Sequence, residues 1–329
     1  MKRSTLRLGV VVIAMLAMAF AVSASAGARP AAGPNAAHIA FMSMWDGQAD
    51  IYAITTAGFA QTNLTHDQTV GLRKDSEPAW SPDGRWIAFQ RSFTKASGSQ
   101  LYLVKSDGSG LHALMPSLGA AVADEHPYWS PDGNSIVFSS NRSGHFELYV
   151  VKAAGTGLVQ LTFTAASVDN LEPAWSPDGS TIAFVRSVQS TTVAGTSSIY
   201  GLSLSTGRTY QMTAPGLGRS DCQPAWAPDS LRLAFESNRA GTEDVYLLDR
   251  RVKGVTRLTA SKQNEYHPTW ATVGSTIALI SDRTGATEVY SLEVPVFPTV
   301  TAPSMRQLTF DKAYKANPAW QHITPIPGS

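Results

Sequence analysis

A tryptophan that follows a proline by two residues recurs six times along this chain of 329 residues. The six are Trp80, Trp129, Trp175, Trp226, Trp270 and Trp320. Their spacings are 49, 46, 51, 44 and 50 residues. A period of this length is typical of an array in which one small structural unit is repeated. The sequence therefore predicts a repeat protein.

Each period contains four short segments with the composition of β-strands. In the repeat of Trp80 they are residues 77–80, 86–89, 101–104 and 114–115, and Gly, Pro, Asn, Asp and Ser bound them. No stretch after residue 26 keeps the apolar period of a helix. Four strands in each of six repeats predict an all-β fold, a six-bladed β-propeller with four antiparallel strands per blade.

The proline of each repeat predicts where its strand lies. Proline has no backbone N–H to donate, so within a sheet it is confined to an edge strand. The prolines are Pro78, Pro127, Pro173, Pro224, Pro268 and Pro318. We therefore expect these segments to be the innermost strands, which line the central channel.

Two further motifs repeat, and both are interpreted as structural. Ser81-Pro82-Asp83-Gly84 and its copies have the residues of a tight turn between the first and second strands. Ser140-Asn141-Arg142-Ser143-Gly144 and its copies follow the second strand, and we expect their Asn and Arg side chains to brace that loop.

The ends of the repeat array complement each other. The array begins with three strand-like segments, residues 38–41, 51–54 and 61–65, and it ends with the first-strand segment 317–320 alone. We expect the C-terminal strand to complete the N-terminal blade, because that pairing removes a free sheet edge.

The N-terminus has the pattern of an export signal. Lys2, Arg3 and Arg7 precede an apolar run from Leu8 to Val22, and Ala24-Ser25-Ala26 fits a cleavage site. We therefore expect a signal peptide at 1–26, a flexible leader at 27–37, the propeller at 38–322 and a tail at 323–329. The mature protein is expected to be periplasmic or secreted, with no membrane span after cleavage.

The charge and cysteine content of the chain argue against some partners and some kinds of site. Without the first 26 residues the chain carries 23 basic and 25 acidic residues, a net charge of −2. This balance argues against a nucleic-acid partner, which needs a concentrated basic surface. Cys222 is the only cysteine, so the chain forms no internal disulfide, and we interpret this thiol as a small apolar group.

The repeated Pro-Ala-Trp-Ser-Pro-Asp-Gly, Ile-Ala-Phe and Ser-Asn-Arg-x-Gly segments together resemble the TolB-like propeller repeat, over residues 38–322. The resemblance implies a six-bladed propeller in an exported protein. In the protein that names the family, an α/β domain precedes the propeller, and the channel mouth docks a peptidoglycan-associated lipoprotein. Only residues 27–37 separate the predicted cleavage site from the first strand, so we expect no such domain here.

Two sets of polar residues precede the tryptophans, and we predict that they form rings at one mouth of the channel. Three positions before each Trp lie Glu77, His126, Glu172, Gln223, His267 and Asn317. Two positions further back, the predicted binding residues are Asp75, Asp124, Asp221 and Glu265; Asn170 and Lys315 occupy the same place in the other repeats. Polar groups that converge on a concave opening predict a binding site.

Two functions fit these rings. The favoured one is a non-catalytic scaffold, expected to be a monomer without a cofactor, which binds an envelope or extracellular protein, peptide or glycan at the channel mouth. The alternative is a metal-dependent polysaccharide lyase or hydrolase. His126, His267, Glu77 and Glu172 could hold a divalent metal, and Lys315 is the only basic candidate in the rings. Nothing in the spacing fixes a ligand geometry, and no catalytic residue is assigned.

Overall fold

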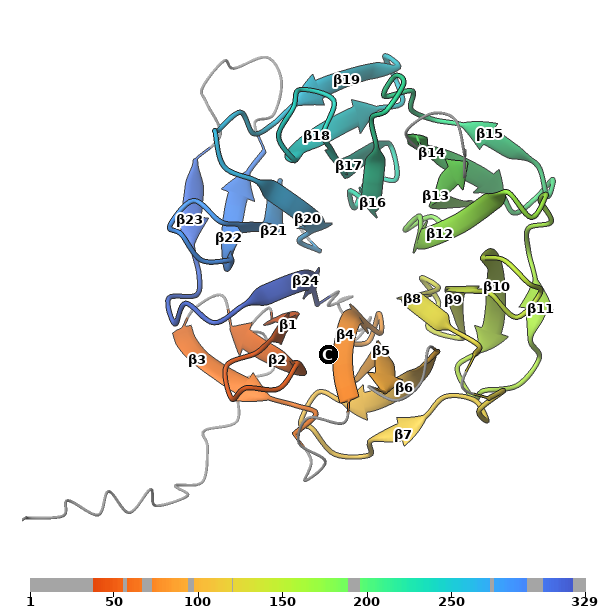
Figure 1. The fold of residues 1–329 in the computed structure, drawn as a ribbon, viewed down its shortest axis with the longest axis horizontal. Coiled ribbons are helices and arrows are strands. Elements are labelled where there is room, and N and C mark those ends of the chain that lie inside the picture. The colour runs from red at the N-terminus through yellow and green to blue at the C-terminus, as the bar shows by residue number, and fades with distance from the viewer. Residues whose placement is uncertain are drawn as a thin grey trace, which may run out of the picture. The chain divides into compact units, whose positions relative to one another are not determined.

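The computed structural model describes residues 38–55, 58–66, 73–93, 98–119, 121–188, 196–272, 275–294 and 304–321. These residues form six four-stranded antiparallel sheets arranged as the blades of a ring (Figure 1). No helix occurs in this part of the chain, and so none that could cross a bilayer. The predicted six-bladed β-propeller is confirmed. The predicted signal peptide, leader and tail lie outside the described residues.

The strands of each blade are given from the innermost outward. Blade 1 contains β24 (Lys315–Trp320), β1 (His38–Ser43), β2 (Asp50–Thr55) and β3 (Gly58–Asn63). Blade 2 contains β4 (Arg73–Trp80), β5 (Trp86–Phe93), β6 (Ser99–Lys105) and β7 (His112–Ala113). Blade 3 contains β8 (Asp124–Trp129), β9 (Ser135–Ser140), β10 (Glu147–Lys152) and β11 (Val159–Gln160).

The other three blades follow the same order. Blade 4 contains β12 (Val168–Trp175), β13 (Thr181–Val188), β14 (Thr196–Ser203) and β15 (Thr209–Gln211). Blade 5 contains β16 (Asp221–Trp226), β17 (Arg232–Ser237), β18 (Asp244–Asp249) and β19 (Gly254–Arg257). Blade 6 contains β20 (Glu265–Trp270), β21 (Thr276–Ser281), β22 (Glu288–Glu293) and β23 (Met305–Gln307).

The proline-bearing strands β4, β8, β12, β16, β20 and β24 are all sheet edges, and they are the strands nearest the centre of the ring (Figure 1). This confirms the placement predicted from the prolines. The C-terminal strand β24 pairs antiparallel with β1, with Trp320 opposite Ile39 and Lys315 opposite Ser43. Blade 1 is therefore built from both ends of the propeller, and the predicted closure is confirmed.

The hydrophobic core lies between neighbouring blades. Each second strand presents a small apolar run, such as Ile87-Ala88-Phe89, whose residues are fully buried. Phe89 packs in one cluster with residues of blade 1, and Ala88 packs in another with residues of blade 3. Burial on both faces explains why these runs show no polar alternation, and each blade therefore depends on its neighbours.

The turn motif behaves as its residues predict. In blade 2, the Gly84 N–H donates to the Ser81 carbonyl over 2.9 Å, and Gly84 has a φ of 67°. The Asp83 carboxylate accepts from the Ser81 hydroxyl at 2.6 Å and from the Arg85 N–H at 3.0 Å. Glycine adopts this left-handed φ without a steric penalty. The motif is therefore a hairpin turn that joins β4 to β5.

Candidate functional site

Every innermost strand contains a β-bulge two and three residues before its tryptophan. In blade 2, Ser76 pairs with Gln90 and Ala79 pairs with Ala88, so Glu77 and Pro78 together face the single residue Phe89. The first residue of each bulge has a left-handed backbone, although none is glycine. Their φ angles are 54° for Glu77, 53° for His126, 52° for Glu172, 51° for Gln223, 51° for His267 and 52° for Asn317.

These six bulge residues are the first ring predicted from the sequence, and they lie within the inner strands. A left-handed conformation is uncommon for a residue with a Cβ and occurs where the surrounding structure holds it. Here the proline that follows each residue disfavours the right-handed region. The buried residue opposite, such as Phe89 or Phe138, holds the partner strand in place.

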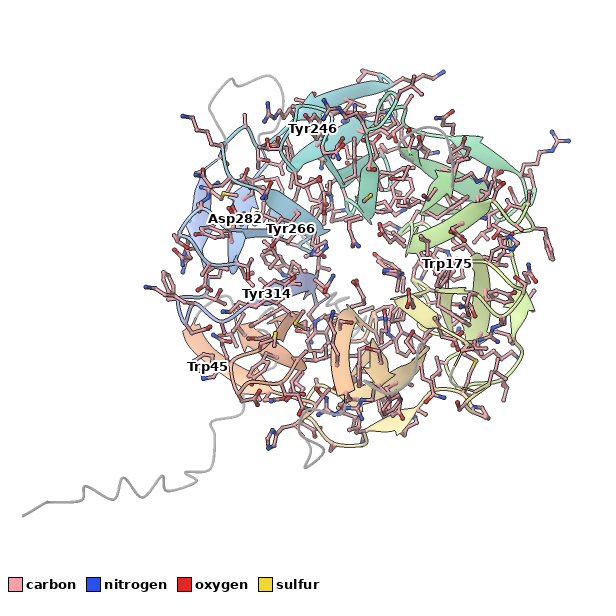
Figure 2. The ribbon with its side chains drawn as sticks, viewed as in Figure 1. Trp45, Trp175, Tyr246, Tyr266, Asp282 and Tyr314 are labelled. Atoms are coloured by element: carbon pink, nitrogen blue, oxygen red, sulfur yellow. The ribbon has the colours of Figure 1, made fainter. Side chains whose placement is uncertain are left out.

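The bulge residues line one cavity of about 340 Å³ at the centre of the ring. All six inner strands contribute to its wall, and the wall also contains ten prolines and the six repeat tryptophans. Trp175, for example, lies at the inner edge of blade 4 (Figure 2). The structure therefore brings together Glu77, His126, Glu172, Gln223, His267 and Asn317, as predicted, in a wall that is otherwise mostly apolar.

Hydrogen bonds link neighbouring members of this ring. The Asn317 side-chain amide donates to Glu77 Oε1 over 2.6 Å, and the Asn317 N–H donates to His267 Nδ1 over 3.2 Å. His126 Nε2 lies 4.0 Å from Glu77 Oε1. Glu172 Oε2 accepts from the Gln223 N–H at 2.7 Å. The six residues thus form a polar belt around the channel, in which His267, Asn317, Glu77 and His126 make one linked group and Glu172 and Gln223 make another.

Burial controls the charge of this belt. It raises the pKa of Glu77 to about 8, with a further contribution from the Glu172 carboxylate. Burial also raises the pKa of Glu172 and lowers the pKa of His126 and of His267 to about 4. Both imidazoles are therefore neutral at pH 7, and the Glu77 carboxyl retains its proton through most of the molecules.

Glu236 belongs to the same electrostatic group, although its place in the sequence did not predict this. Its carboxylate Oε2 accepts from the His267 N–H at 3.1 Å, and burial raises the pKa of Glu236 to about 8. The sequence does hold one indication of its role, namely an acidic residue at a position that is uncharged in other blades. Glu236 directly follows Phe235, and the equivalent residues of blades 3, 4 and 6 are Ser139, Val185 and Ile280.

The second predicted set of binding residues does not line the cavity. Asp75, Asp124, Asp221 and Glu265 lie at or near the starts of the inner strands, and each is at most 7% exposed. Each carboxylate pairs with an arginine of its own blade: Arg91 at 2.7 Å, Arg142 at 2.7 Å, Arg239 at 2.7 Å and Arg283 at 2.9 Å. These carboxylates therefore brace the blades internally and do not form the predicted polar ring at the channel mouth.

The same arginines also pack on aromatic rings. The Arg142 guanidinium carbon lies 5.3 Å from the centre of the Phe138 ring and 5.0 Å from that of Tyr149. Arg239 repeats this arrangement on Phe235 and Tyr246. An arginine held by a carboxylate and stacked on an aromatic pair fixes the loop after the second strand. The loop-bracing interpretation of the Ser-Asn-Arg motif is thus confirmed.

Blade 1 departs from this pattern. Lys315 pairs with Ser43 as Asp124 pairs with Ser140, so a cation replaces the acid. Lys315 is fully buried, and its Nζ lies 3.1 Å from Glu288 Oε2 and 2.5 Å from Asp311 Oδ1. Two residues after Ser43, where the other blades with this motif have arginine, stands Trp45, which is 54% exposed (Figure 2).

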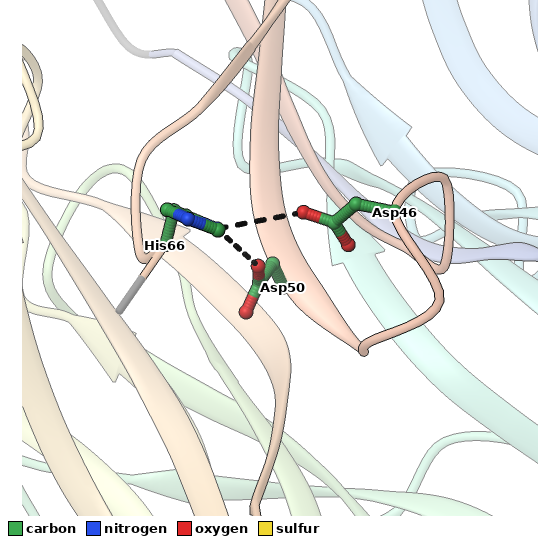
Figure 3. A group of neighbouring side chains, drawn as sticks. All are labelled: Asp46, Asp50 and His66. Carbon is green, nitrogen blue, oxygen red and sulfur yellow. Dashed lines mark ion pairs between the residues drawn. The ribbon is translucent and has the colours of Figure 1, made fainter. Parts of the chain in front are cut away.

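A different group has the spacing of metal ligands. His66 Nδ1 lies 3.6 Å from Asp46 Oδ2 and 4.0 Å from Asp50 Oδ2 (Figure 3). Within the described ranges, this is the one group of three or more His, Cys, Asp or Glu side chains whose ligand atoms all lie within 4.8 Å of one another. Asp50 also pairs with Arg73 at 2.8 Å. A metal held by the channel residues remains a prediction.

Comparison with known proteins gives one family match. A family model described as the TolB beta propeller domain matches residues 120–223 and 171–323. The Tol-Pal system protein TolB of Desulfosudis oleivorans is 38% identical over 65 residues, which is 20% of this chain and 14% of that protein. The matched segment therefore spans much less than two thirds of that relative.

Solved structures share the fold at low sequence identity. TolB from Acinetobacter baumannii superposes with a TM-score of 0.68 and 17% identity, over 86% of this chain and 66% of that one. Oligogalacturonate lyase from Vibrio parahaemolyticus gives a TM-score of 0.51 and 14% identity, over 75% of this chain and 72% of that one. At such identities the similarity concerns the fold alone.

Proposed function

This chain belongs to the family of TolB beta propeller domains, and from that premise we propose that it is an exported, non-catalytic propeller that binds a protein, peptide or glycan partner in its channel. The observation that carries the proposal is the belt of six left-handed bulge residues around a cavity of about 340 Å³. A volume of this size is within the range of ligand pockets.

Variation within the repeat supports this assignment. The proline and the tryptophan recur in all six blades, as expected of positions that the fold requires. The bulge position instead carries Glu, His, Glu, Gln, His and Asn in turn, although every blade uses the same strained backbone there. Strained positions that carry varied polar side chains into a cavity are typical of binding sites. The polar group that faces the cavity therefore differs from blade to blade.

The charge of the cavity wall favours binding over lyase chemistry. The wall residues that the structure describes include no lysine or arginine to remove a proton from a sugar ring. Lys315, the basic candidate from the sequence, is fully buried between Glu288 and Asp311. The metal-dependent alternative makes a different prediction, namely that added Zn²⁺, Ca²⁺ or Mn²⁺ raises the melting temperature and that the His126→Ala, His267→Ala variant loses this response.

The proposal is tested by partner capture from envelope extracts, followed by titration of the purified partner. The Glu172→Ala, Gln223→Ala variant removes polar groups from the belt, and we expect it to weaken binding by roughly tenfold or more, as the loss of buried hydrogen bonds at an interface does. Leu217→Ala is the matched control, because Leu217 is 87% exposed and is not part of the cavity wall. Equal dissociation constants for the belt variant and the wild type would contradict channel binding.

A further inference from the structure

The channel carboxylates differ from the buried acids near the starts of the inner strands in having no arginine partner. Asp75, Asp124, Asp221 and Glu265 each pair with an arginine. Glu77 and Glu172, by contrast, accept from neutral donors, the Asn317 amide and the Gln223 N–H. No lysine or arginine within the described residues forms an ion pair with either of them. Once ionised, a carboxylate can accept about four hydrogen bonds, so each of the two then has acceptor capacity left for a donor in the cavity.

Other acceptor groups in the belt also lack a hydrogen-bond donor. His126 Nδ1 is buried and has no hydrogen-bond partner. Its ring is neutral at pH 7, because burial lowers the pKa of His126 to about 4, so one ring nitrogen can accept. The side-chain amides of Gln223 and Asn317 contribute carbonyl oxygens at the same level. The belt is therefore rich in acceptors, whereas the rest of the wall consists mainly of proline and tryptophan.

We propose that the channel takes a protonated primary amine on an apolar stem, either a lysine side chain or an N-terminal ammonium of the bound partner. An ammonium group has three donors and no acceptor, which matches the unpaired acceptors of the belt. The stem lies against the proline and tryptophan wall, where aromatic faces also attract a cation. This inference rests on the proposed function, and it names the chemical group that the same site recognises.

Protonation of the belt gives the binding a characteristic pH dependence. Because the pKa of Glu77 is raised to about 8, the empty site holds a proton there at pH 7, and an arriving ammonium releases it to solvent. Binding should therefore strengthen as pH rises from 6 to 8, while an alkylamine with a pKa near that of lysine, roughly 10.4, stays protonated. The charges of Glu172, Lys74, Glu125 and Glu236 act on Glu77, and the His126 and Asn317 side chains lie 4.0 Å and 2.6 Å from its Oε1.

The test compares hexylamine with 1-hexanol by isothermal titration calorimetry on the whole protein at pH 8. We expect the wild type to bind the amine at least tenfold more tightly than the alcohol, and the Glu77→Gln, Glu172→Gln variant to lose this preference. Glu293→Gln is the matched control, because Glu293 is the exposed last residue of β22 and is not part of the cavity wall; it should keep the preference. An equal affinity for amine and alcohol in the wild type, or a preference that survives the double substitution, would overturn the inference.

A second measurement needs no variant. Titration of wild-type protein with hexylamine in buffers of different ionisation enthalpy measures the protons released, and we expect a net release at pH 7 that disappears at pH 9. An absence of release at pH 7 would count against the inference even if the double variant failed to fold.

Peptides distinguish the two sources of the ammonium. Acetyl-Ala-Lys-Ala-amide offers only the side-chain ammonium, Ala-Gln-Ala-amide offers only the N-terminal one, and acetyl-Ala-Gln-Ala-amide is the uncharged control. Binding of either charged peptide above the control supports the inference and identifies the source. If neither binds but the belt variants still lose the envelope partner, the ammonium assignment fails and the proposed function stands. If amines bind normally while belt variants keep the partner, the proposed function fails instead.

Discussion

The bulge residue of each inner strand combines a strained backbone with a position in the cavity wall. A left-handed residue with a Cβ is less stable than glycine at the same place by roughly 1–2 kcal/mol, yet all six bulges carry larger side chains. At Asn317 the φ is 52°, and the side-chain amide donates to Glu77 Oε1. The polar side chain that these positions supply to the cavity, rather than their backbone conformation, therefore explains why they do not carry glycine.

This conformation predicts an unusual order of stability at Gln223. Valine is β-branched and tolerates a positive φ poorly, so Gln223→Val should unfold at lower urea than Gln223→Gly, by about 1–2 kcal/mol in the free energy of unfolding. Cys222, the preceding residue on β16, does not have a positive φ. There the order should reverse, since valine suits an extended strand better than glycine does. The same order at both positions would contradict the bulge geometry.

At the scale of the strands and loops, the carboxylate–arginine–aromatic unit determines how blades 3, 5 and 6 hold the loop after their second strand. Asp221 is fully buried and accepts two contacts of 2.7 Å from Arg239 Nη2, and Arg239 in turn lies over Phe235 and Tyr246. The unit joins β16, β17 and β18, so removing its cation affects three strands at once.

Substitution of this arginine tests the unit. Arg239→Ala leaves the buried Asp221 carboxylate without its cation, and we expect a loss of about 3–5 kcal/mol in the free energy of unfolding. Adding Asp221→Asn should recover part of that loss, because the uncompensated charge is removed. Arg251→Ala breaks the exposed pair with Asp249 and should leave the midpoint of the same urea titration nearly unchanged, because solvent screens that pair. Similar losses at Arg239 and Arg251 would show that the unit does not brace the blade.

Sequence alone predicted these elements unevenly, for physical reasons. Pro78 and Trp80 identified an inner edge strand, because a missing N–H restricts where a strand can lie. Asp75 was placed at the channel mouth, since its partner Arg91 lies 16 residues away and only the register of β4 against β5 brings the two side chains together. The left-handed bulge could not be seen either, because Glu, His, Gln and Asn side chains do not demand a positive φ.

At the scale of the whole molecule, the ring depends on one pairing between distant parts of the chain. The β24 strand supplies the inner strand of blade 1, and Trp320 packs in one cluster with residues of blade 1 and blade 6. This closure was predictable, because three strand-like segments at one end and a single segment at the other add up to one blade. Without β24, the edge of β1 and the flank of blade 6 lose their cover.

Truncation tests this dependence. Removing residues 315–329 takes away β24, and we expect loss of the near-UV circular dichroism signal and of a cooperative melting transition. Removing residues 322–329 alone spares β24 and should leave both unchanged. Retention of the wild-type melting temperature by the longer truncation would show that the other blades hold the ring without this strand.

Blade 1 also affects how a partner can be seated. Six near-identical blades around an axis would offer a docking protein several equivalent rotational settings. Blade 1 breaks this equivalence, because it carries Lys315 in place of an acid or amide. It also carries Trp45 and Tyr314, which are 54% and 50% exposed, and the Met44 N–H donates to the Tyr314 carbonyl between them. A partner that packs on either of these exposed aromatic rings would therefore meet the propeller in one rotational setting rather than six.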